Sequence, residues 1–174
     1  GRPLHLPDFA TTFGLNGAVI SAVDLVKGLG RAAGMEVLDV AGATGLLNTN
    51  YEGKVQAARE FLQHGDFVFV HVEAPDECGH GGDPLEKKEA IERFDTRIVA
   101  PLLDAFPEAA VLVTCDHFTP CQERTHVSDP VPFAFAWPEG SHNGAATYDE
   151  AAAASTGLVL KRGFQLIPWA LDRL

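Results

Sequence analysis

The hydrophobic positions of this chain fall into two patterns, short apolar runs and longer stretches in which apolar residues recur every three or four positions. Short apolar runs bounded by Gly, Pro or Asp predict strands, and the longer spacing predicts amphipathic helices. Strands are predicted at 17–22, 36–40, 67–72, 109–114 and 131–137. Helices are predicted at 24–33, 51–64, 84–105, 149–154 and 165–174. Because strand and helix alternate, the predicted fold class is α/β, with a mainly parallel sheet flanked by helices.

Glycine and proline set the predicted boundaries of these elements. Gly34 and Gly65 follow the first two helices as C-terminal stops, and Pro84 opens the long third helix, which Pro101 is expected to kink. The strand at 67–72 is apolar on both faces, which is typical of a central parallel strand. A Gly-rich loop is predicted after it, and residues 1–16, which are punctuated by Pro and Gly, are predicted to be an entry segment.

Candidate metal ligands follow two of the apolar runs. Two aspartates and three histidines are involved, namely Asp76, His80, Asp116, His117 and His126. In α/β sheets, functional side chains gather in loops beyond the carboxyl ends of the strands, so these segments are expected to converge. Carboxylate and imidazole together suit a borderline ion such as Zn²⁺ or Mn²⁺. Five ligands exceed the needs of one tetrahedral ion and favour a dinuclear site of the kind that clamps a phosphoryl group.

The spacing of these residues adds geometric expectations. Asp76 and His80 can reach the same ion if the loop around Gly79 turns helically. Adjacent side chains on an extended backbone point in opposite directions, so Asp116 and His117 do not easily chelate one ion and are expected to straddle a site or approach it from two sides. Each motif alone is also common in proteins that bind no metal. The residues by themselves therefore leave a structural or surface interpretation open.

Four other polar residues near these motifs have alternative interpretations. His71 alternates into a buried strand and is expected to be a core histidine, whereas Glu73 ends that strand and could support the ligands. Arg124 could bind a phosphate oxygen or simply be solvated. Thr44 lies in a Gly-Ala-Thr-Gly turn, which could be a phosphate nest but is more typical of a plain turn.

Composition and charge exclude some functions. The net charge of −11, without a basic block to offset it, argues against a nucleic-acid surface. No apolar run approaches the roughly 18 residues needed to cross a membrane. Cys78, Cys115 and Cys121 form no Cys-x-x-Cys pair, which favours a reducing cytoplasm and bystander thiols over a disulfide framework or thiolate ligands.

Several motifs together resemble the archaeal-type 2,3-bisphosphoglycerate-independent phosphoglycerate mutases of the alkaline phosphatase superfamily. The motifs are His71-Val-Glu-Ala-Pro-Asp-Glu-Cys-Gly-His80, Asp116-His117-Phe-Thr-Pro120 and Arg124-Thr-His-Val-Ser-Asp-Pro-Val-Pro-Phe133. The stretch Ala18-Val-Ile-Ser-Ala-Val-Asp-Leu-Val-Lys-Gly28 also resembles this family. The resemblance implies an alkaline-phosphatase-like core and interconversion of 2- and 3-phosphoglycerate through a phosphoserine, in glycolysis and gluconeogenesis.

The resemblance also implies roles for individual residues. Asp76, His80 and His126 match the ligands of one divalent ion, Mn²⁺ or Zn²⁺, and Asp116 and His117 match two ligands of a second. Lys27 matches a lysine that reaches the active site, although by spacing alone Lys27 and Asp24 are an ordinary helical surface pair. The implied partner is the small-molecule substrate phosphoglycerate, and the implied location is the cytoplasm.

The chain departs from the family pattern in its length. Members of the family are much longer, and their nucleophilic serine, a further metal-binding aspartate and most of an inserted lid domain have no counterpart here. We therefore expect residues 1–16 to lead out of an inserted domain and residues 17–174 to be the C-terminal part of a truncated metal-binding domain. By itself, this chain is expected to bind at most one ion well, to lack mutase activity and to self-associate through uncovered strand edges. Another phosphohydrolase of the same superfamily, or a non-enzymatic metal-binding module, remains an alternative.

Overall fold

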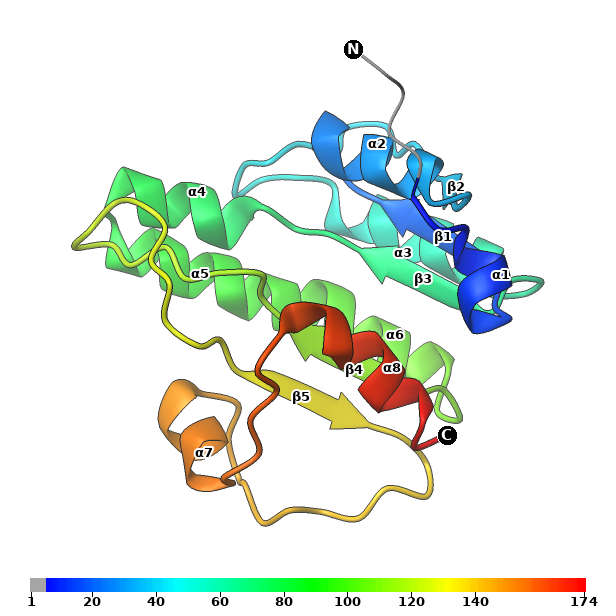
Figure 1. The fold of residues 1–174 in the computed structure, drawn as a ribbon. Coiled ribbons are helices and arrows are strands. Elements are labelled where there is room, and N and C mark those ends of the chain that lie inside the picture. Colours follow the sequence, from blue (N-terminus) through cyan, green and yellow to red (C-terminus); the bar gives the residue numbers. More distant parts are fainter. Residues whose placement is uncertain (1–5) are drawn as a thin grey trace. The chain divides into compact units, whose positions relative to one another are not determined.

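The computed structural model describes residues 6–174, which form two compact units. The first unit comprises the chain up to residue 105 together with residues 120–125, and the second comprises residues 106–119 and 126–174. The chain therefore passes from the first unit to the second, back, and again to the second (Figure 1). In residues 6–174, every helix is too short or too polar to cross a membrane.

A three-stranded parallel sheet forms the centre of the first unit. Its strands are β1 (Gly17–Ile20), β2 (Glu36–Val37) and β3 (Phe67–Val70), in the order β2-β1-β3. The predicted parallel sheet is confirmed, but β1 and not β3 is its middle strand, and Phe69 of β3 is 43% exposed. An apolar run indicates that both faces of a strand are buried, but it does not show which strands pair along the two edges. Composition therefore could not identify the middle strand of the sheet.

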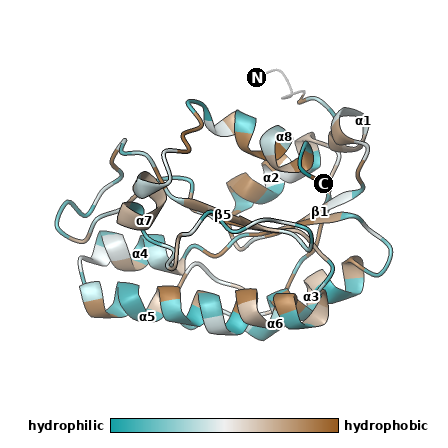
Figure 2. Ribbon diagram, turned by 90° about the horizontal axis from the view of Figure 1, so that it is seen from below, coloured by the Kyte–Doolittle hydropathy of each residue, from teal (hydrophilic) through white to brown (hydrophobic). Residues whose placement is uncertain are grey.

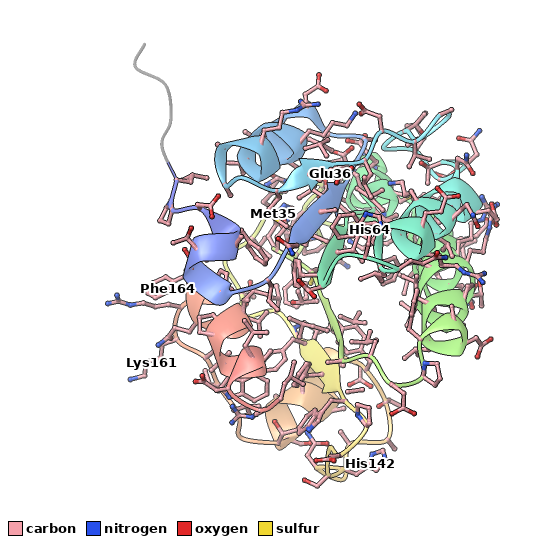
Figure 3. The ribbon with its side chains drawn as sticks, turned by 90° about the vertical axis from the view of Figure 1, so that its right-hand side faces the viewer. Met35, Glu36, His64, His142, Lys161 and Phe164 are labelled. Carbon is pink, nitrogen blue, oxygen red and sulfur yellow. The ribbon has the colours of Figure 1, made fainter. Side chains whose placement is uncertain are left out.

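Two helices cover opposite faces of this sheet. Helix α2 (Asp24–Ala32) connects β1 to β2, and α3 (Tyr51–Phe61) connects β2 to β3. Since β2 and β3 lie on opposite sides of β1, right-handed crossovers place the two helices on opposite faces, as Figure 3 shows in side view. The predicted end of α2 is confirmed, because Gly34 adopts a left-handed φ of 76° directly after the C-cap.

The entry segment contains a helix that the sequence did not predict. Helix α1 (Phe9–Phe13) begins at Asp8, whose side chain accepts a hydrogen bond from the Thr11 backbone N–H at 2.8 Å. Phe9 and Met35 pack so closely on Gly17 that a Cβ there would lie 2.9 Å from each side chain; Met35 is labelled in Figure 3. Residues 1–5 of the predicted entry segment lie outside the described residues.

The predicted Gly-rich loop after β3 is also wrong, since most of it is helix α4 (Ala74–Gly81). Pro75 lies in the first turn, where its missing N–H costs nothing, and Gly82 ends the helix with φ 76°. Buried small residues, Ala74, Cys78 and Ala90, pack α4 against the following helix. The glycines that indicated a loop instead accompany this close packing and the helix end.

The long helix predicted at 84–105 is interrupted rather than continuous. It comprises α5 (Pro84–Phe94), a π-helical turn (Asp95–Val99) and α6 (Ala100–Ala105). Proline has no N–H to donate, so Pro101 disturbs the regular ladder at the turn that precedes it, and a widened turn lies there. In Figure 2, α5 is coloured mostly hydrophilic with hydrophobic residues recurring along it, as expected for an amphipathic helix.

The second unit contains a two-stranded antiparallel ribbon. Strand β4 (Val111–Thr114) pairs with β5 (Phe133–Ala136), and Leu112 lies opposite Phe135. Both strands were predicted, but the parallel arrangement holds only for the first unit. Adjacent strands can pair in either direction when the connection between them is long, so hydrophobic pattern alone did not determine this pairing.

Short helices complete the second unit. They are α7 (Glu150–Ser155) and α8 (Leu166–Leu171), the latter preceded by a single 3₁₀ turn. Trp169 of α8 packs edge-on against Phe133 and Phe135 of the ribbon, with ring centroids 5.2 and 5.9 Å apart. These aromatic contacts of α8 cover one face of the ribbon. Both helices lie where the sequence predicted them.

Candidate metal centre

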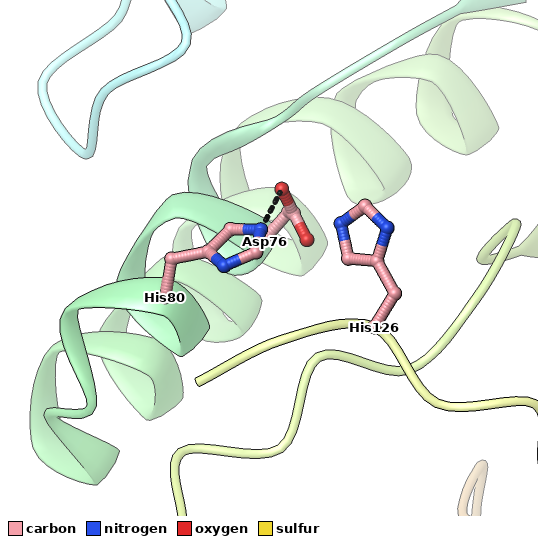
Figure 4. A group of neighbouring side chains, drawn as sticks. All are labelled: Asp76, His80 and His126. Carbon is pink, nitrogen blue, oxygen red and sulfur yellow. Dashed lines mark ion pairs between the residues drawn. The ribbon is translucent and has the colours of Figure 1, made fainter. Parts of the chain in front are cut away.

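Helix α4 presents two of the predicted ligands on one face. Asp76 and His80 are four residues apart, and their Oδ2 and Nε2 atoms lie 3.4 Å from each other (Figure 4). Such a pair meets because side chains at i and i+4 stack on the same helix face. The backbone N–H of Asp76 donates to the Glu73 carbonyl at 2.8 Å, so the first turn of α4 fixes the position of the Asp76 backbone.

The hydrogen-bond partner of the second ring nitrogen of His80 determines the tautomer of this ring. Nδ1 lies 2.9 Å from the backbone carbonyl oxygen of Arg124. A carbonyl oxygen only accepts, so Nδ1 must carry the proton, and in the neutral ring the lone pair sits on Nε2, facing Asp76. Two electron-rich atoms facing each other call for a cation between them, either a second proton or a metal ion. A backbone carbonyl behind a histidine is also the usual support of a metal-binding imidazole.

A strained residue supplies that carbonyl. Arg124 has φ 53°, a left-handed conformation in which the other non-glycine residues of 6–174 are not found. Its N–H donates to the Pro120 carbonyl at 2.8 Å, and its guanidinium lies against Gly82 at the end of α4. Strain of this kind costs on the order of 1 kcal/mol and persists only where the surroundings require it. This conformation could not be predicted from the sequence, since arginine has no preference for it.

His126 follows two residues after Arg124. Two residues span at most about 7 Å, so the chain that brings the Arg124 carbonyl to His80 also carries His126 close to it. One ligand atom each from Asp76, His80 and His126 lies within 4.8 Å of the other two, and Figure 4 shows the three side chains together. The three residues that were predicted to share an ion are thus brought together.

Asp116 and His117 follow β4 in the second unit. The Oδ2 atom of Asp116 lies 3.4 Å from Nε2 of His117, and its Oδ1 accepts the His117 backbone N–H at 3.1 Å. The expectation that these adjacent side chains point in opposite directions is wrong, because the backbone bends here instead of continuing the strand. The His117 ring also stacks on the His126 ring at 3.7 Å, and the Val127 N–H donates to the Phe118 carbonyl at 3.1 Å.

Lys27, the remaining predicted site residue, lies on α2. Its Nζ donates to Oδ1 of Asp39 at 2.8 Å, rather than pairing with Asp24. This hydrogen bond holds the pKa of the Asp39 carboxyl below its usual value. Asp39 follows β2, so the pair lies beyond the carboxyl edge of the parallel sheet. The position is compatible with an active-site lysine but assigns it no contact with the Asp76–His80 pair.

Beside the predicted site lies a buried lysine that the sequence analysis missed. Lys54 of α3 has no exposed surface, and its Nζ donates to the His71 carbonyl at 2.7 Å. Burial lowers the pKa of Lys54 to about 8, against the opposing influence of Glu73, whose own pKa is raised by burial. A signal was available, because Lys54 lies three residues after Tyr51 and four before Ala58, on the apolar stripe of its helix.

Two other candidates have ordinary structural contacts. The His71 ring is half-buried, with Nδ1 3.0 Å from the Ser21 hydroxyl oxygen. Thr44 lies in a turn, where its N–H donates to the Thr49 hydroxyl oxygen at 2.8 Å and its own hydroxyl oxygen accepts from the Leu46 N–H at 3.3 Å. Side-chain hydrogen bonds of this local kind are typical of plain turns.

Comparisons with known proteins give consistent matches at the level of sequence. The chain is 51% identical, over 99% of its length, to a probable 2,3-bisphosphoglycerate-independent phosphoglycerate mutase of Geobacter sulfurreducens. It is 41% identical over its whole length to 2,3-bisphosphoglycerate-independent phosphoglycerate mutase 1 of Archaeoglobus fulgidus. The matched regions make up 44% and 43% of these relatives, so the chain spans less than half the length of either protein.

Solved structures give the same picture of the fold. The PH0037 protein from Pyrococcus horikoshii superposes on 95% of this chain with a TM-score of 0.89 at 37% identity, and the match covers 51% of that protein. The cofactor-independent phosphoglycerate mutase of Thermoplasma acidophilum superposes on 88% of the chain with a TM-score of 0.68 at 28% identity, over 35% of that protein. The α/β fold class is therefore confirmed by these neighbours.

A family model described as the metalloenzyme superfamily matches residues 2–161. This range includes α4, the left-handed Arg124 and every predicted ligand from Asp76 to His126. Both the sequence match and the facing carboxylate and imidazoles therefore support divalent-metal use. With nearly all of its length matched, the chain belongs to the metalloenzyme superfamily.

Proposed function

We propose that this chain supplies metal ligands to a 2,3-bisphosphoglycerate-independent phosphoglycerate mutase, an isomerase that interconverts 2- and 3-phosphoglycerate. The relatives with this name support the activity, and their greater length means that the proposal concerns a protein of which this chain is a part. The substrate would be a small phosphorylated acid.

The observation that carries the proposal is the His80 ring and its two neighbours. The Arg124 carbonyl holds the proton on Nδ1 and leaves Nε2 facing the carboxylate of Asp76, 3.4 Å away. His126 adds a third ligand atom within 4.8 Å. Two imidazoles and one carboxylate form the donor set of a borderline divalent ion, for which we propose Mn²⁺ or Zn²⁺.

Asp116 and His117 are proposed to contribute to a second ion. Their facing atoms are 3.4 Å apart, so the two side chains can approach one ion from the same side. When bound, the ions would neutralise phosphoryl charge and lower the pKa of a serine hydroxyl. Two protein ligands hold an ion less firmly than three, so we expect the chain by itself to bind one ion with high affinity and to lack mutase activity.

A titration of the chelator-stripped chain with Mn²⁺ and with Zn²⁺ tests this proposal. We expect one saturable equivalent, and a loss of affinity of about 100-fold or more for Asp76→Asn or His126→Ala, since each substitution removes a ligand of the site. The matched control is His142→Ala, because His142 is an exposed histidine (Figure 3) that belongs to none of the proposed ligands.

Two outcomes would contradict the proposal. One is saturable binding that Asp76→Asn and His126→Ala leave unchanged, since the ion would then lie elsewhere. The other is phosphoglycerate interconversion by the chain alone, which would require a nucleophile that we have not assigned. Binding that falls equally in the His142→Ala control would indicate nonspecific association with surface imidazoles.

A further inference from the structure

The segment from β3 to α4 is where the metal ligands are placed, and a buried charge lies behind it. Lysine is among the residues least often fully buried, because an ammonium group loses its hydration in the protein interior. Lys54 nevertheless has no exposed surface, and its helix neighbours Tyr51 and Val55 belong to the hydrophobic core of the first unit. A methionine or leucine would suit this position for packing alone, so the ammonium group itself needs an explanation.

The ammonium group binds the backbone at the point where the chain leaves the sheet. His71 is the first residue after β3, and its N–H still donates to the Ile20 carbonyl of β1 at 2.8 Å. The His71 carbonyl accepts from Nζ of Lys54 at 2.7 Å. A buried backbone carbonyl requires a donor, and here a helix side chain provides it where the strand ladder ends.

The same lysine also interacts electrostatically with Glu73, two residues after His71. The opposite charges attract, which favours the charged form of both groups. The Glu73 side chain lies so close to Gly45 that a Cβ there would be 2.1 Å from its Oε2 atom. The Glu73 side chain therefore lies against the 42–45 turn, and the Glu73 carbonyl accepts the Asp76 N–H that starts α4.

We propose that Lys54 is a positioning residue for the metal ligands, because it ties the His71–Glu73 segment to α3 and so fixes the origin of the helix that carries Asp76 and His80. This inference rests on the proposed metal site. It assigns Lys54 no contact with the ion. Groups that hold ligands in place typically contribute 10–100-fold to metal affinity.

Three variants separate positioning from packing. Lys54→Met keeps the volume and removes the ammonium group, Val55→Ala removes core packing on the adjacent residue of the same helix, and Asp76→Asn removes a ligand. Mn²⁺ affinity and urea-unfolding stability are measured for each variant of the 174-residue chain. We expect Lys54→Met to retain stability but lose about 10-fold or more in affinity, and Val55→Ala to lose stability while binding as the unaltered chain does.

The opposite result is equally informative. Removing a nearby positive charge without moving the ligands would tighten cation binding, so unchanged or tighter binding by Lys54→Met would overturn the inference. So would a loss of affinity in Val55→Ala as large as in Lys54→Met. If Lys54→Met does not fold, Glu73→Gln provides the test, because it weakens the attraction between Lys54 and residue 73. This variant should also weaken Mn²⁺ binding. Normal binding by Glu73→Gln would refute the inference. If binding withstands Asp76→Asn, the proposed metal site itself is wrong.

Discussion

At the scale of single residues, polar atoms in this chain are placed by backbone carbonyls. The Arg124 carbonyl holds His80, and the His71 carbonyl holds Lys54. Asp76 and His80 could be chosen from the sequence as candidate ligands because carboxylate and imidazole have a recognisable metal chemistry. The carbonyl groups that hold these side chains could not be predicted, because every residue has a carbonyl and its direction depends on the fold. The left-handed conformation of Arg124 is the clearest example.

The burial of Lys54 predicts an unusual pH dependence of stability. Its pKa is lowered from 10.5 to about 8 in the folded state, so the unfolded chain binds more protons between these values. Stability conferred by this group therefore rises with pH across that window, by an amount on the order of 3 kcal/mol. Urea unfolding of the unaltered chain and of Lys54→Met at pH 7.5, 9 and 10 measures this contribution to the free energy of unfolding. The difference between them should move in favour of the unaltered chain as pH rises.

The control for this experiment is Lys88→Met, which removes a lysine that is 66% exposed on α5. A pH-dependent difference of the same size for Lys88→Met would show that the effect does not come from the burial of Lys54. A pH-independent difference for Lys54→Met as well would show that Lys54 titrates alike in the folded and unfolded chain, contrary to its burial.

At the scale of elements, the most informative difference between expectation and structure is α4. Gly79, Gly81 and Gly82 predicted a loop, yet the segment is helical because Pro75 suits a first turn and small residues allow α4 to pack on α5. Hydrophobic spacing located α2 and α3 correctly, and α3 buries one continuous stripe from Tyr51 to Phe61. A glycine needed for close packing cannot be distinguished from a glycine in a loop until the neighbouring helix is known.

Helix α5 offers a test of how independently these elements form. Its N-cap, Asp83, accepts hydrogen bonds through Oδ1 from the backbone N–H groups of Leu85 at 2.8 Å and Glu86 at 3.2 Å. Asp83→Ala should lower the free energy of unfolding by about 1 kcal/mol because two helix-end donors lose their acceptor. Thermal or urea unfolding measures this, with the exposed Asp104→Ala on α6 as control. Equal stability of both variants would show that the cap contributes nothing.

At the scale of the whole molecule, the chain forms two units whose sheets differ in kind. The first has a parallel sheet of three strands, and the second has an antiparallel ribbon. Alternation of strand and helix predicted the first because each parallel pair needs a crossover helix. The direction of β5 could not be predicted in the same way, because an irregular connection of 18 residues between β4 and β5 permits either direction.

The edge position of β3 supports the expectation that the chain self-associates. In the described sheet β3 pairs with β1, and Phe69 on this strand is 43% exposed. An edge strand with an uncovered aromatic side chain tends to pair with another chain. Light scattering over a wide concentration range should show dimers or larger species, and Phe69→Lys should reduce them because a charge on an edge strand opposes pairing. A monomer at every concentration would contradict this expectation.

The pairing of β1 with β3 also determines the order of events on the ribosome. Residue 17 lies opposite residue 67, so the partner of β1 is synthesised 50 residues later. At about 5–20 residues per second, this interval lasts on the order of 3–10 s. During those seconds the nascent chain holds a strongly apolar segment, Ala18 to Ile20, that can be paired on only one side, by β2. The middle strand of the sheet is thus made first and completed last.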